Sequence, residues 1–401
     1  MVSGVGFLLG RRHLKLFRYG AGATPASFGR RAGATPASSW YGVGATPATP
    51  ATPAALGAEA PLPHPTGWFC LALSHEIRPG ALLTRRLADT DVVLARGASG
   101  VLRALHPHCP HLGAHLGVLG EVSGDEITCG FHRFTFSLDG PCLRTAYGRP
   151  APRAMLGTLH VRESGGLVLV WHGQEPPSWE PPAIPTAGWQ RPRGTTYEVA
   201  SHPQQMTENV IDFGHLEQLH GATLARKPDA VFDGPSCTGG FQVVSTLPRI
   251  GRVETEYTFA VHGLGLTVIE CALPVGAART RFFALPTPIG PWRTRFQFAA
   301  TATTGSDGPL GTLGARLLRE VFYAVHATGS LPDLPVWQYQ AYQPRPRLAA
   351  GDGPIGKYRK WAEQFYPAEQ FYPPEQFDPT EQFRPVEQPR PAAEQPRPEE
   401  P

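Results

Sequence analysis

The sequence predicts an α+β protein in which a small all-β domain precedes a larger domain of helices and antiparallel sheet. Short apolar runs in the first half, such as DVVLARG, GVLRALH and GLVLVWH, are separated by glycines, a pattern typical of β-hairpins. Alternating runs in the second half, from FQVVSTL to RTRFQFAATAT, predict an antiparallel sheet. The segment LGARLLREVFYAVHAT predicts an amphipathic helix that covers this sheet.

Low-complexity sequence at both ends limits the part of the chain that can form a core. The 401 residues include 45 glycines and 44 prolines, and residues 1–58 repeat a GATPA unit whereas residues 367–401 repeat units such as EQFYP. Neither end has a structural period, so neither can bury enough surface to offset its ordering entropy. We therefore assign 1–58 to an N-terminal extension, 59–173 to an N-terminal domain, 174–195 to a Pro-rich linker, 196–366 to a C-terminal domain and 367–401 to a tail.

Charge and hydropathy narrow the classes of partner. The formal net charge is +3, and the part between the two ends is nearly neutral, so we do not expect nucleic acid as a partner. No run of about 20 apolar residues predicts a transmembrane helix. The acid-free, Arg-rich start has the composition of an organelle transit peptide, with an extension of no targeting role as the alternative. We expect an intracellular protein, with membrane or organelle association left open.

The six cysteines are too few for a disulfide scaffold, and their positions divide them into two groups. Two of them form mixed pairs with histidine, namely Cys109-x-His111 and, after seventeen intervening residues, Cys129-x2-His132. The other four stand alone in apolar or strand-like sequence, and we expect each to be a small buried side chain. These four are Cys70, Cys142, Cys237 and Cys271.

Two loops that each offer one thiolate and one imidazole can bind a [2Fe-2S] cluster. Cys109 and Cys129 would bind one iron, and His111 and His132 the other, which is the Rieske arrangement. A structural zinc site is the competing interpretation of any set of two Cys and two His. Zinc fingers separate the Cys pair from the His pair, whereas each loop here mixes the two residue types, which favours the cluster.

The segments CPHLGAHL and CGFHRFTFSLDG resemble the Rieske domain of the Rieske non-haem iron oxygenases. Ala114 stands where respiratory-type Rieske proteins carry a disulfide cysteine, which favours the oxygenase type. The second loop departs from the C-P-x-H-G-W pattern of the family because it has Gly130, Arg133 and Phe134. We therefore expect a difference in the cluster's potential or in the surface that meets the electron donor.

A second candidate site follows the linker, in the block ENVIDFGHLEQLH. Non-haem iron that activates oxygen needs two imidazoles and one carboxylate on one face, with open positions left over. His215 and His220 would lie about 140° apart on a regular helix, so a distorted turn or π-bulge must bring them together. Asp212 precedes His215 by three residues, where its carboxylate could accept the second N–H of that imidazole.

This block resembles the catalytic-helix motif of the same oxygenase family. The resemblance implies that His215 and His220 bind the iron and that Asn209 and Asp212 are catalytic residues. It also implies a ring-shaped homotrimer in which Asp212 relays electrons from His132 of one subunit to His215 of the next.

A later carboxylate must supply the third iron ligand. Asp333 lies in an Asp-x-x-x-Trp segment that resembles the C-terminal end of the sterol-acting branch of the family, where such a segment supplies the ligand. Asp307 and Asp352 are the competing carboxylates in this part of the chain.

The resemblance is strongest to the sterol-acting branch, which includes cholesterol 7-desaturases and bacterial 3-ketosteroid 9α-hydroxylases. The motifs LAAGDGPI, KYRKW and QFY carry it. It implies one [2Fe-2S] cluster and one mononuclear Fe²⁺ per subunit, with O₂ and a sterol or steroid as substrates. The chain has no well-placed G-x-G-x-x-G for a nucleotide, so electrons from NAD(P)H would come through a separate reductase or ferredoxin.

Three functions are compatible with these motifs. We expect 7,8-desaturation of cholesterol to 7-dehydrocholesterol. A steroid hydroxylase of the 3-ketosteroid 9α-hydroxylase type, or another Rieske monooxygenase, is the alternative within the same enzyme class. A non-catalytic electron carrier or redox sensor is the alternative from another class, and it would need the cluster but not the second iron.

Overall fold

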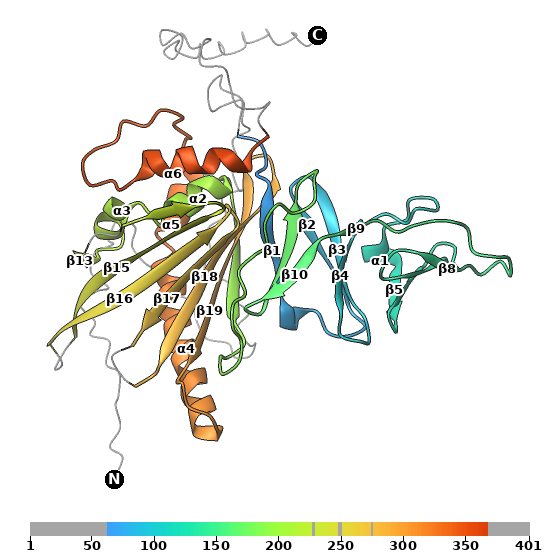
Figure 1. Ribbon diagram of the computed structural model, residues 1–401, viewed down its shortest axis with the longest axis horizontal. Helices are drawn as coiled ribbons and strands as arrows, with labels where there is room; N and C mark the ends of the chain where they lie inside the picture. Colours follow the sequence, from blue (N-terminus) through green and yellow to red (C-terminus); the bar gives the residue numbers. More distant parts are fainter. Residues whose placement is uncertain (1–61, 227–228, 248–250, 274–275, 368–401) are drawn as a thin grey trace, which may run out of the picture. The chain divides into compact units, whose positions relative to one another are not determined.

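The computed structural model describes residues 62–226, 229–247, 251–273 and 276–367 (Figure 1). All of them belong to one unit that spans Thr49–Pro401. The predicted N-terminal extension 1–58, and all but the first residue of the predicted tail 367–401, lie outside the described residues. No helix in the described ranges has both the length and the hydropathy needed to cross a bilayer.

The N-terminal domain is built from three small antiparallel sheets. Their strand orders are β1-β11-β10, β2-β3-β4-β9 and β5-β6-β7-β8. The strands are β1 (Gly67–Leu73), β2 (Leu82–Leu87), β3 (Thr90–Arg96), β4 (Leu102–Leu105), β5 (Gly120–Ser123), β6 (Glu126–Cys129), β7 (Thr135–Ser137), β8 (Cys142–Arg144), β9 (Thr158–Leu159), β10 (Val161–Ser164) and β11 (Leu167–His172). A 3₁₀ helix, η3 (Ser74–Glu76), and a short helix, α1 (Leu116–Leu119), join them.

Strand β3 explains why the run DVVLARG is apolar without alternation. Val92 and Leu94 pack into one hydrophobic cluster with β1 and β11, whereas Val93 and Ala95 pack into a second cluster with the cysteine loops. Successive side chains of a strand point to opposite faces, so a strand that is covered on both sides is apolar throughout. The predicted all-β domain is confirmed, and this strand connects its two cores.

The C-terminal domain is organised around one antiparallel sheet of eight strands. The order is β12-β19-β18-β17-β16-β15-β13, and β14 pairs with β15. The strands are β12 (Arg193–Val199), β13 (Thr223–Arg226), β14 (Val231–Asp233), β15 (Ser236–Leu247), β16 (Gly251–His262), β17 (Leu266–Ala272), β18 (Arg279–Gly290) and β19 (Arg293–Thr303). The alternating runs from FQVVSTL to RTRFQFAATAT lie in this sheet, so the predicted α+β class is confirmed.

Helices cover this sheet and line one end of it (Figure 1). They are α2 (Pro203–Glu208), α3 (Phe213–Gln218), α4 (Pro309–Gly329), α5 (Asp333–Tyr339) and α6 (Ile355–Ala362), followed by the 3₁₀ helix η4 (Glu363–Phe365). The long helix α4 contacts β12, β18 and β19, and its buried residues are Ala315 and Phe322. The segment LGARLLREVFYAVHAT is therefore the covering helix that its pattern predicts.

The two domains share a core along β1. Trp68 of β1 packs in one cluster with Phe283 and Leu285 of the C-terminal sheet. A Cβ at Gly265 would lie only 2.3 Å from the carbonyl oxygen of Trp68, so the turn before β17 approaches β1 too closely for a side chain. Trp179 fixes the predicted linker at the same place, because its carbonyl accepts the Trp68 indole N–H at 2.9 Å.

Buried polar contacts join α2 to α6. Arg359 donates two hydrogen bonds to Glu208, at 2.7 and 2.9 Å, and both side chains are largely buried. The hydroxyl of Tyr358, which is completely buried, donates to the carbonyl of Gln204 at 3.0 Å. A buried ion pair that loses one partner costs about 3–5 kcal/mol, so these contacts strongly fix the end of α2. Asn209 follows directly after this fixed end.

Three of the four isolated cysteines are buried as expected. Cys70, Cys237 and Cys271 are at most 2% exposed, and burial raises the pKa of Cys70 and of Cys237 to about 12. Such thiols stay protonated and act as small apolar side chains. Cys142 differs from the expectation because it is only half-buried.

Three histidines, His202 fully buried and His262 and His326 largely buried, make the fold sensitive to acid. Burial lowers the pKa of His202 to about 3, and those of His262 and His326 to about 4. A histidine of the unfolded chain titrates near 6.5, so below that pH the unfolded state binds more protons than the folded state. The stabilisation by neutral histidines is therefore complete above about pH 6.5 and decreases as the pH falls towards 4, by up to about 1.4 kcal/mol per pH unit for each histidine.

We expect His326→Phe to remove about one third of this contribution to the pH dependence. The histidine packs between Phe282 and Phe322, so a phenyl ring fits the site without taking up a proton. Free energies of unfolding from urea titrations between pH 7 and 4.5 measure the slope. An identical slope in the wild type and the variant would show that His326 does not titrate with folding.

Candidate metal centres

The predicted cluster ligands lie on two turns of the same backbone geometry. In each turn the N–H of the cysteine donates to the carbonyl five residues later, and the N–H four residues later donates to the cysteine carbonyl, at 2.8 to 3.0 Å. The residue four positions after the cysteine is left-handed in both turns, with φ of 77° at Gly113 and 56° at Arg133. A non-glycine residue there costs about 1 kcal/mol. The second turn thus keeps the geometry of the first, although Arg133 replaces the glycine of the family pattern.

The four side chains of these turns converge. Cys109 and Cys129 are each only 2% exposed. Burial raises the pKa of the Cys109 thiol, and the neighbouring thiol of Cys129 raises it further. The ring centroids of His111 and His132 are 4.8 Å apart, and Phe134 stacks on His111 at 4.1 Å with an angle of 12° between the ring planes.

This donor set fits a Rieske cluster. Nδ1 of His132 is buried without a hydrogen-bond partner among the described residues. A buried polar atom without a partner is costly, and a metal bond would satisfy it. Two adjacent thiols and two adjacent imidazoles are the ligands that a [2Fe-2S] cluster of this type requires.

The second centre joins three side chains from two segments of the chain. Nε2 of His220 lies 3.2 Å from Oδ1 of Asp333, and Nε2 of His215 lies 4.0 Å from the same oxygen. All three ligand atoms lie within 4.8 Å of one another. Two imidazoles and one carboxylate are the facial triad of oxygen-activating non-haem iron, so the residues fit the ion that the sequence implies.

A distorted turn after α3 brings the two histidines together. His215 lies within α3, and His220 follows its end. The carbonyl of His215 accepts the N–H of Leu219 at 2.8 Å and the N–H of His220 at 3.3 Å. The second bond spans five residues as in a π-helix, and Gly221 then leaves the helix with φ of 64°. The structure thus has the distortion that the five-residue spacing requires.

Asp212 contacts His215 differently from the expectation. Its carboxylate does not accept the imidazole N–H but caps α3, because Oδ1 accepts the backbone N–H of His215 at 3.1 Å. The backbone carbonyl of Asp212 lies 2.5 Å from Nδ1 of His215 and takes the imidazole N–H instead. This leaves Nε2 of His215 free to face Asp333. Burial lowers the pKa of His215, which keeps the imidazole neutral as a metal ligand must be.

Asn209 contacts the acidic ligand. Its amide Nδ2 donates to Oδ1 of Asp333 at 3.2 Å. Asp333 is 6% exposed, and Trp337, one turn later on α5, is buried against Phe296. A buried carboxylate needs hydrogen bonds or a cation: Asn209 donates one hydrogen bond to Asp333, and a metal ion held with the two histidines would supply the positive charge. The sequence motif contains Asn209, but no local pattern could have revealed its contact with a residue 124 positions later.

The competing carboxylates lie elsewhere. Asp307 is exposed in the loop before α4. Asp352 accepts the N–H of Ala349 at 2.6 Å and so closes its own loop. This loop packs against the segment that leads into α3, because a Cβ at Gly353, where φ is 92°, would lie 2.2 Å from the carbonyl oxygen of Ile211.

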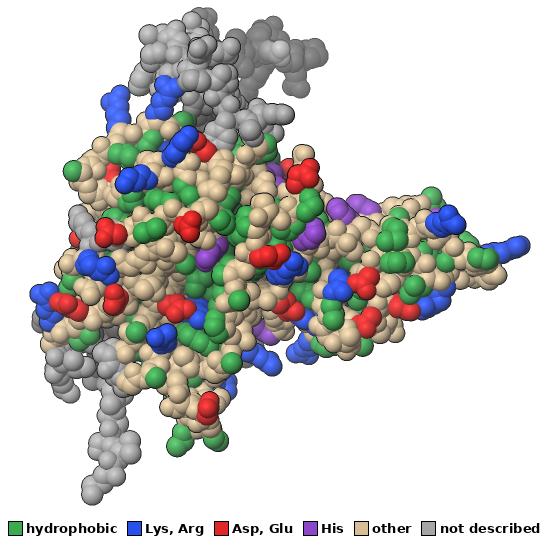
Figure 2. All heavy atoms as spheres, viewed as in Figure 1, with side chains coloured by type: hydrophobic (Ala, Val, Ile, Leu, Met, Phe, Trp, Pro, Cys, Tyr) green, Lys and Arg blue, Asp and Glu red, His purple; other side chains and the backbone are tan. Residues whose placement is uncertain are grey.

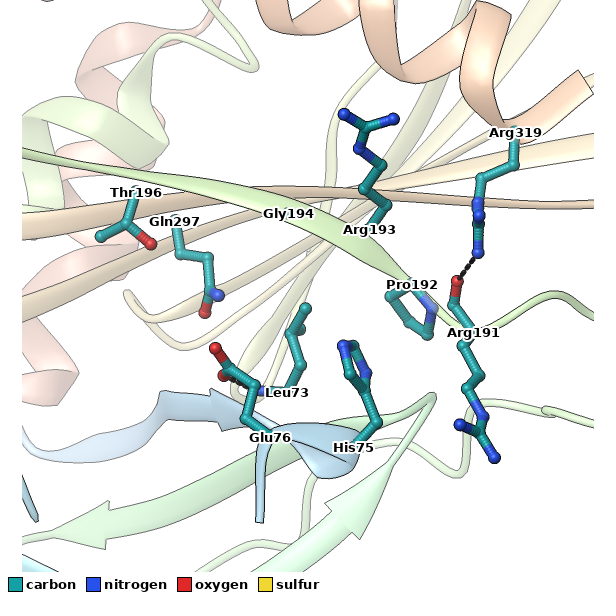
Figure 3. Close-up of a pocket in the computed structure, with 10 residues that line it drawn as sticks. All are labelled: Leu73, His75, Glu76, Arg191, Pro192, Arg193, Gly194, Thr196, Gln297 and Arg319. Carbon is teal, nitrogen blue, oxygen red and sulfur yellow. Dashed lines mark hydrogen bonds between the residues drawn. The ribbon is translucent and has the colours of Figure 1, made fainter. Parts of the chain in front are cut away.

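A cavity of about 380 Å³ lies between η3 and the start of β12 (Figure 3). No predicted metal ligand lines it. Two of its arginines already have partners in the chain: Arg319 donates to the carbonyl of Arg191 at 2.8 Å, and Arg193 pairs with Glu320. We therefore do not assign the substrate to this cavity.

Two protein-family models match separate parts of the chain. Residues 67–155 match the Rieske [2Fe-2S] domain, and residues 170–366 match the 3-ketosteroid 9alpha-hydroxylase C-terminal domain. The four predicted cluster ligands lie in the first range, and the three predicted iron ligands lie in the second.

Curated relatives and solved structures extend this likeness. A protein named cholesterol 7-desaturase nvd from Bombyx mori is 27% identical over 337 residues, which cover 78% of this chain and 71% of that protein. A probable 3-ketosteroid-9-alpha-monooxygenase oxygenase component from Rhodococcus rhodochrous is 28% identical over 325 residues, covering 75% and 79%. The crystal structure of dicamba monooxygenase bound to dicamba shares the fold, with a TM-score of 0.59, 18% identity and coverage of 75% and 96%.

Proposed function

Because the chain belongs to the Rieske oxygenases, we propose that it is an oxidoreductase that acts on a sterol or steroid, with 7,8-desaturation of cholesterol as the first candidate reaction. The relatives named cholesterol 7-desaturase support the choice of reaction. The arrangement of His215, His220 and Asp333 is the observation that carries the proposal, because an electron carrier has no need of a second metal site.

Hydrogen bonds within the chain fix the orientation of two ligand side chains of the second centre. When bound, the cluster supplies single electrons and the ferrous iron supplies the activation of oxygen. The carbonyl of Asp212 fixes the tautomer of His215, and the amide of Asn209 fixes the Asp333 carboxylate. Phe298 of the sheet and Trp337 of α5 pack in one apolar cluster, which supports the segment that carries Asp333.

Electron delivery would involve other proteins and other copies of this chain. We place a separate NAD(P)H-dependent reductase or ferredoxin upstream of the cluster. Figure 1 shows β5 and β8, beside the cysteine loops, well apart from α3 and α5. This separation supports a homotrimer in which Asp212 lies between His215 and His132 of the partner subunit.

Hydroxylation is the second candidate reaction. The Rhodococcus relatives named 3-ketosteroid-9-alpha-monooxygenase and the matching C-terminal domain model favour it. Both reactions begin with removal of one hydrogen from the substrate, and they differ in whether a second hydrogen leaves or an oxygen atom is added. The position of the substrate carbon relative to the centre decides between them.

A sterol panel tests the proposal. The holoenzyme, supplied with a generic reductase, NADH and O₂, is incubated with cholesterol, a 3-ketosteroid and a non-steroid aromatic acid, and product masses are measured. We expect cholesterol to lose two hydrogen atoms. A product that gains one oxygen atom would replace desaturation by hydroxylation, and turnover of the aromatic acid alone would overturn the sterol assignment.

Two Asp212 variants distinguish its role as the N-cap of α3 from its proposed role in electron transfer between subunits. We expect Asp212→Asn and Asp212→Ala to retain both metal centres and to slow turnover at least about tenfold, since neither has a carboxylate. Only Asp212→Ala should also lose about 1 kcal/mol of stability, because Asn still caps α3. Iron content, single-turnover rates and urea unfolding measure these effects. Full activity of Asp212→Asn would leave Asp212 with a capping role alone.

A further inference from the structure

Helix α4 is apolar on two opposite faces, and only one of them packs on the sheet. Ala315 and Phe322 face the sheet. The opposite face carries five large apolar side chains that are each between 53% and 86% exposed. These are Leu310, Leu313, Leu317, Val321 and Val325. We call these five residues the outer stripe of α4.

The outer stripe is continuous and free of charge. At 100° per residue its five members span an arc of about 120°. Gly314, Ala324 and Thr328 are the other residues in this arc, so it contains no ionisable side chain. Figure 2 shows hydrophobic side chains exposed at the end of α4 that projects past the sheet. Contiguous exposed apolar surface of this kind marks an interaction site.

Arginines lie on one flank of α4, between the outer stripe and the sheet. At 100° per residue Arg316 lies about 60° beyond the edge of the stripe, and Arg319 lies on the side of the helix opposite to the centre of the stripe. The side chains of Arg316 on α4 and Arg191 before β12 have no partner among the described residues. Burial lowers the pKa of Arg319, and the nearby guanidinium groups of Arg316 and Arg193 lower it further, so these cations lie close together. Glu320 is the acidic residue among them, and it is paired with Arg193 and Arg319. This flank of α4, which we call the arginine border, therefore carries a net positive charge.

The size and charge of this surface favour one occupant. The stripe is roughly 23 Å long and 10 Å wide, from the rise and diameter of a helix. It is one row of side chains on a single helix, whereas each side of a stable protein interface uses about 20–30 residues. An apolar helix face bordered by cations instead matches the headgroup boundary of an anionic bilayer.

We propose that the outer stripe of α4 and its arginine border dock the enzyme on an anionic lipid surface. The apolar surface continues beyond the helix, because Leu331 and Val336 are each 41% exposed and flank Asp333. Docking would thus place the segment that carries the acidic iron ligand beside the lipid. The view that the lipid delivers the substrate rests on the proposed function, since sterols dissolve in bilayers.

Vesicle flotation of the metal-loaded full chain tests the docking. We expect binding to vesicles of phosphatidylcholine with phosphatidylserine, and weaker binding to phosphatidylcholine alone. The double variant Leu317→Glu/Val321→Glu should bind at least about tenfold more weakly. Val231→Glu, at an equally exposed valine on β14, is the matched control and should bind like the wild type. Arg316→Gln should reduce only the part of the binding that depends on phosphatidylserine.

Two results would overturn the docking. One is a wild-type protein that does not float with anionic vesicles. The other is a double variant that floats normally but has a smaller mass than the wild type in light scattering, which would make the stripe an interface between copies.

A separate readout distinguishes failure of docking from failure of the proposed reaction. Iron content and circular dichroism confirm that the double variant folds, and flotation needs no substrate. If cholesterol is the substrate, the double variant should match the wild type when cholesterol is supplied in cyclodextrin and should fall behind when it is supplied in vesicles. Absence of turnover in both formats, with normal flotation, would reject the reaction and leave the docking intact.

Discussion

Asp333→Ala is expected to lose the mononuclear iron and more than about a hundredfold of turnover, while the cluster stays in place. The carboxylate is the acidic member of the triad, and its Oδ1 faces both His220 and Asn209. Alanine removes the one anionic ligand, so two neutral imidazoles remain to hold a divalent cation. The iron content per chain should fall from the two irons of the cluster plus the mononuclear iron to the two irons of the cluster alone. The visible spectrum should be unchanged.

Asp352→Ala is the matched control for this variant. Asp352 lies in the loop that packs against the segment that leads into α3, but its carboxylate accepts the N–H of Ala349. We expect this change to leave the iron content intact. Iron loss from Asp352→Ala with retention in Asp333→Ala would exchange the two assignments.

Cys129→Ser is expected to bleach the visible absorption of the protein and to abolish turnover driven by a reductase. The buried thiols of Cys109 and Cys129 are neighbours, and a serine hydroxyl is a far poorer ligand for iron than a thiolate. The mononuclear site is built from other segments, so one iron per chain should remain. Absorption and electron paramagnetic resonance spectra of the reduced protein measure the cluster directly.

Cys142→Ser tests whether the bleaching is specific. This half-buried cysteine belongs to the same domain but lies outside the two turns. We expect its substitution to preserve the colour. A coloured Cys129→Ser protein, or a colourless Cys142→Ser protein, would require a different set of cluster ligands.

The fold class, and the grouping of the four candidate cluster ligands on two similar turns, could be predicted because both depend on local patterns. The strands of the C-terminal sheet follow from alternation over a few residues, and each cysteine turn contains its own histidine. The short covered strand β3 was predictable for the same reason, since an unbroken apolar run indicates burial on both faces.

The second centre was predictable only in part. The spacing of His215 and His220 indicates a distorted turn, and the structure contains one. The partner of the imidazole N–H could not be read from spacing, because the Asp212 carboxylate can satisfy either the imidazole or the start of α3, and the helix start takes it. The contacts of Asn209 and Asp333 depend on how α2 and α5 pack, which is a property of the whole domain.

The exposure of the outer stripe of α4 could not be predicted from the sequence, for a different reason. A helix that is apolar on one face is predicted to lie on a sheet, and this is where α4 lies. The same sequence is apolar on the opposite face as well, but periodicity cannot tell which of two apolar faces is covered.

The origin of the three iron ligands has a thermodynamic consequence. His215 and His220 come from the segment around α3, whereas Asp333 comes from the start of α5. In the sequence, α5 follows all the strands of the sheet. An ion held by both segments closes a loop of more than a hundred residues and is released only when they part. Chelation should therefore lower the melting temperature and loosen α3 and α5 first, so that loss of metal and loss of order at this end of the sheet become one linked equilibrium.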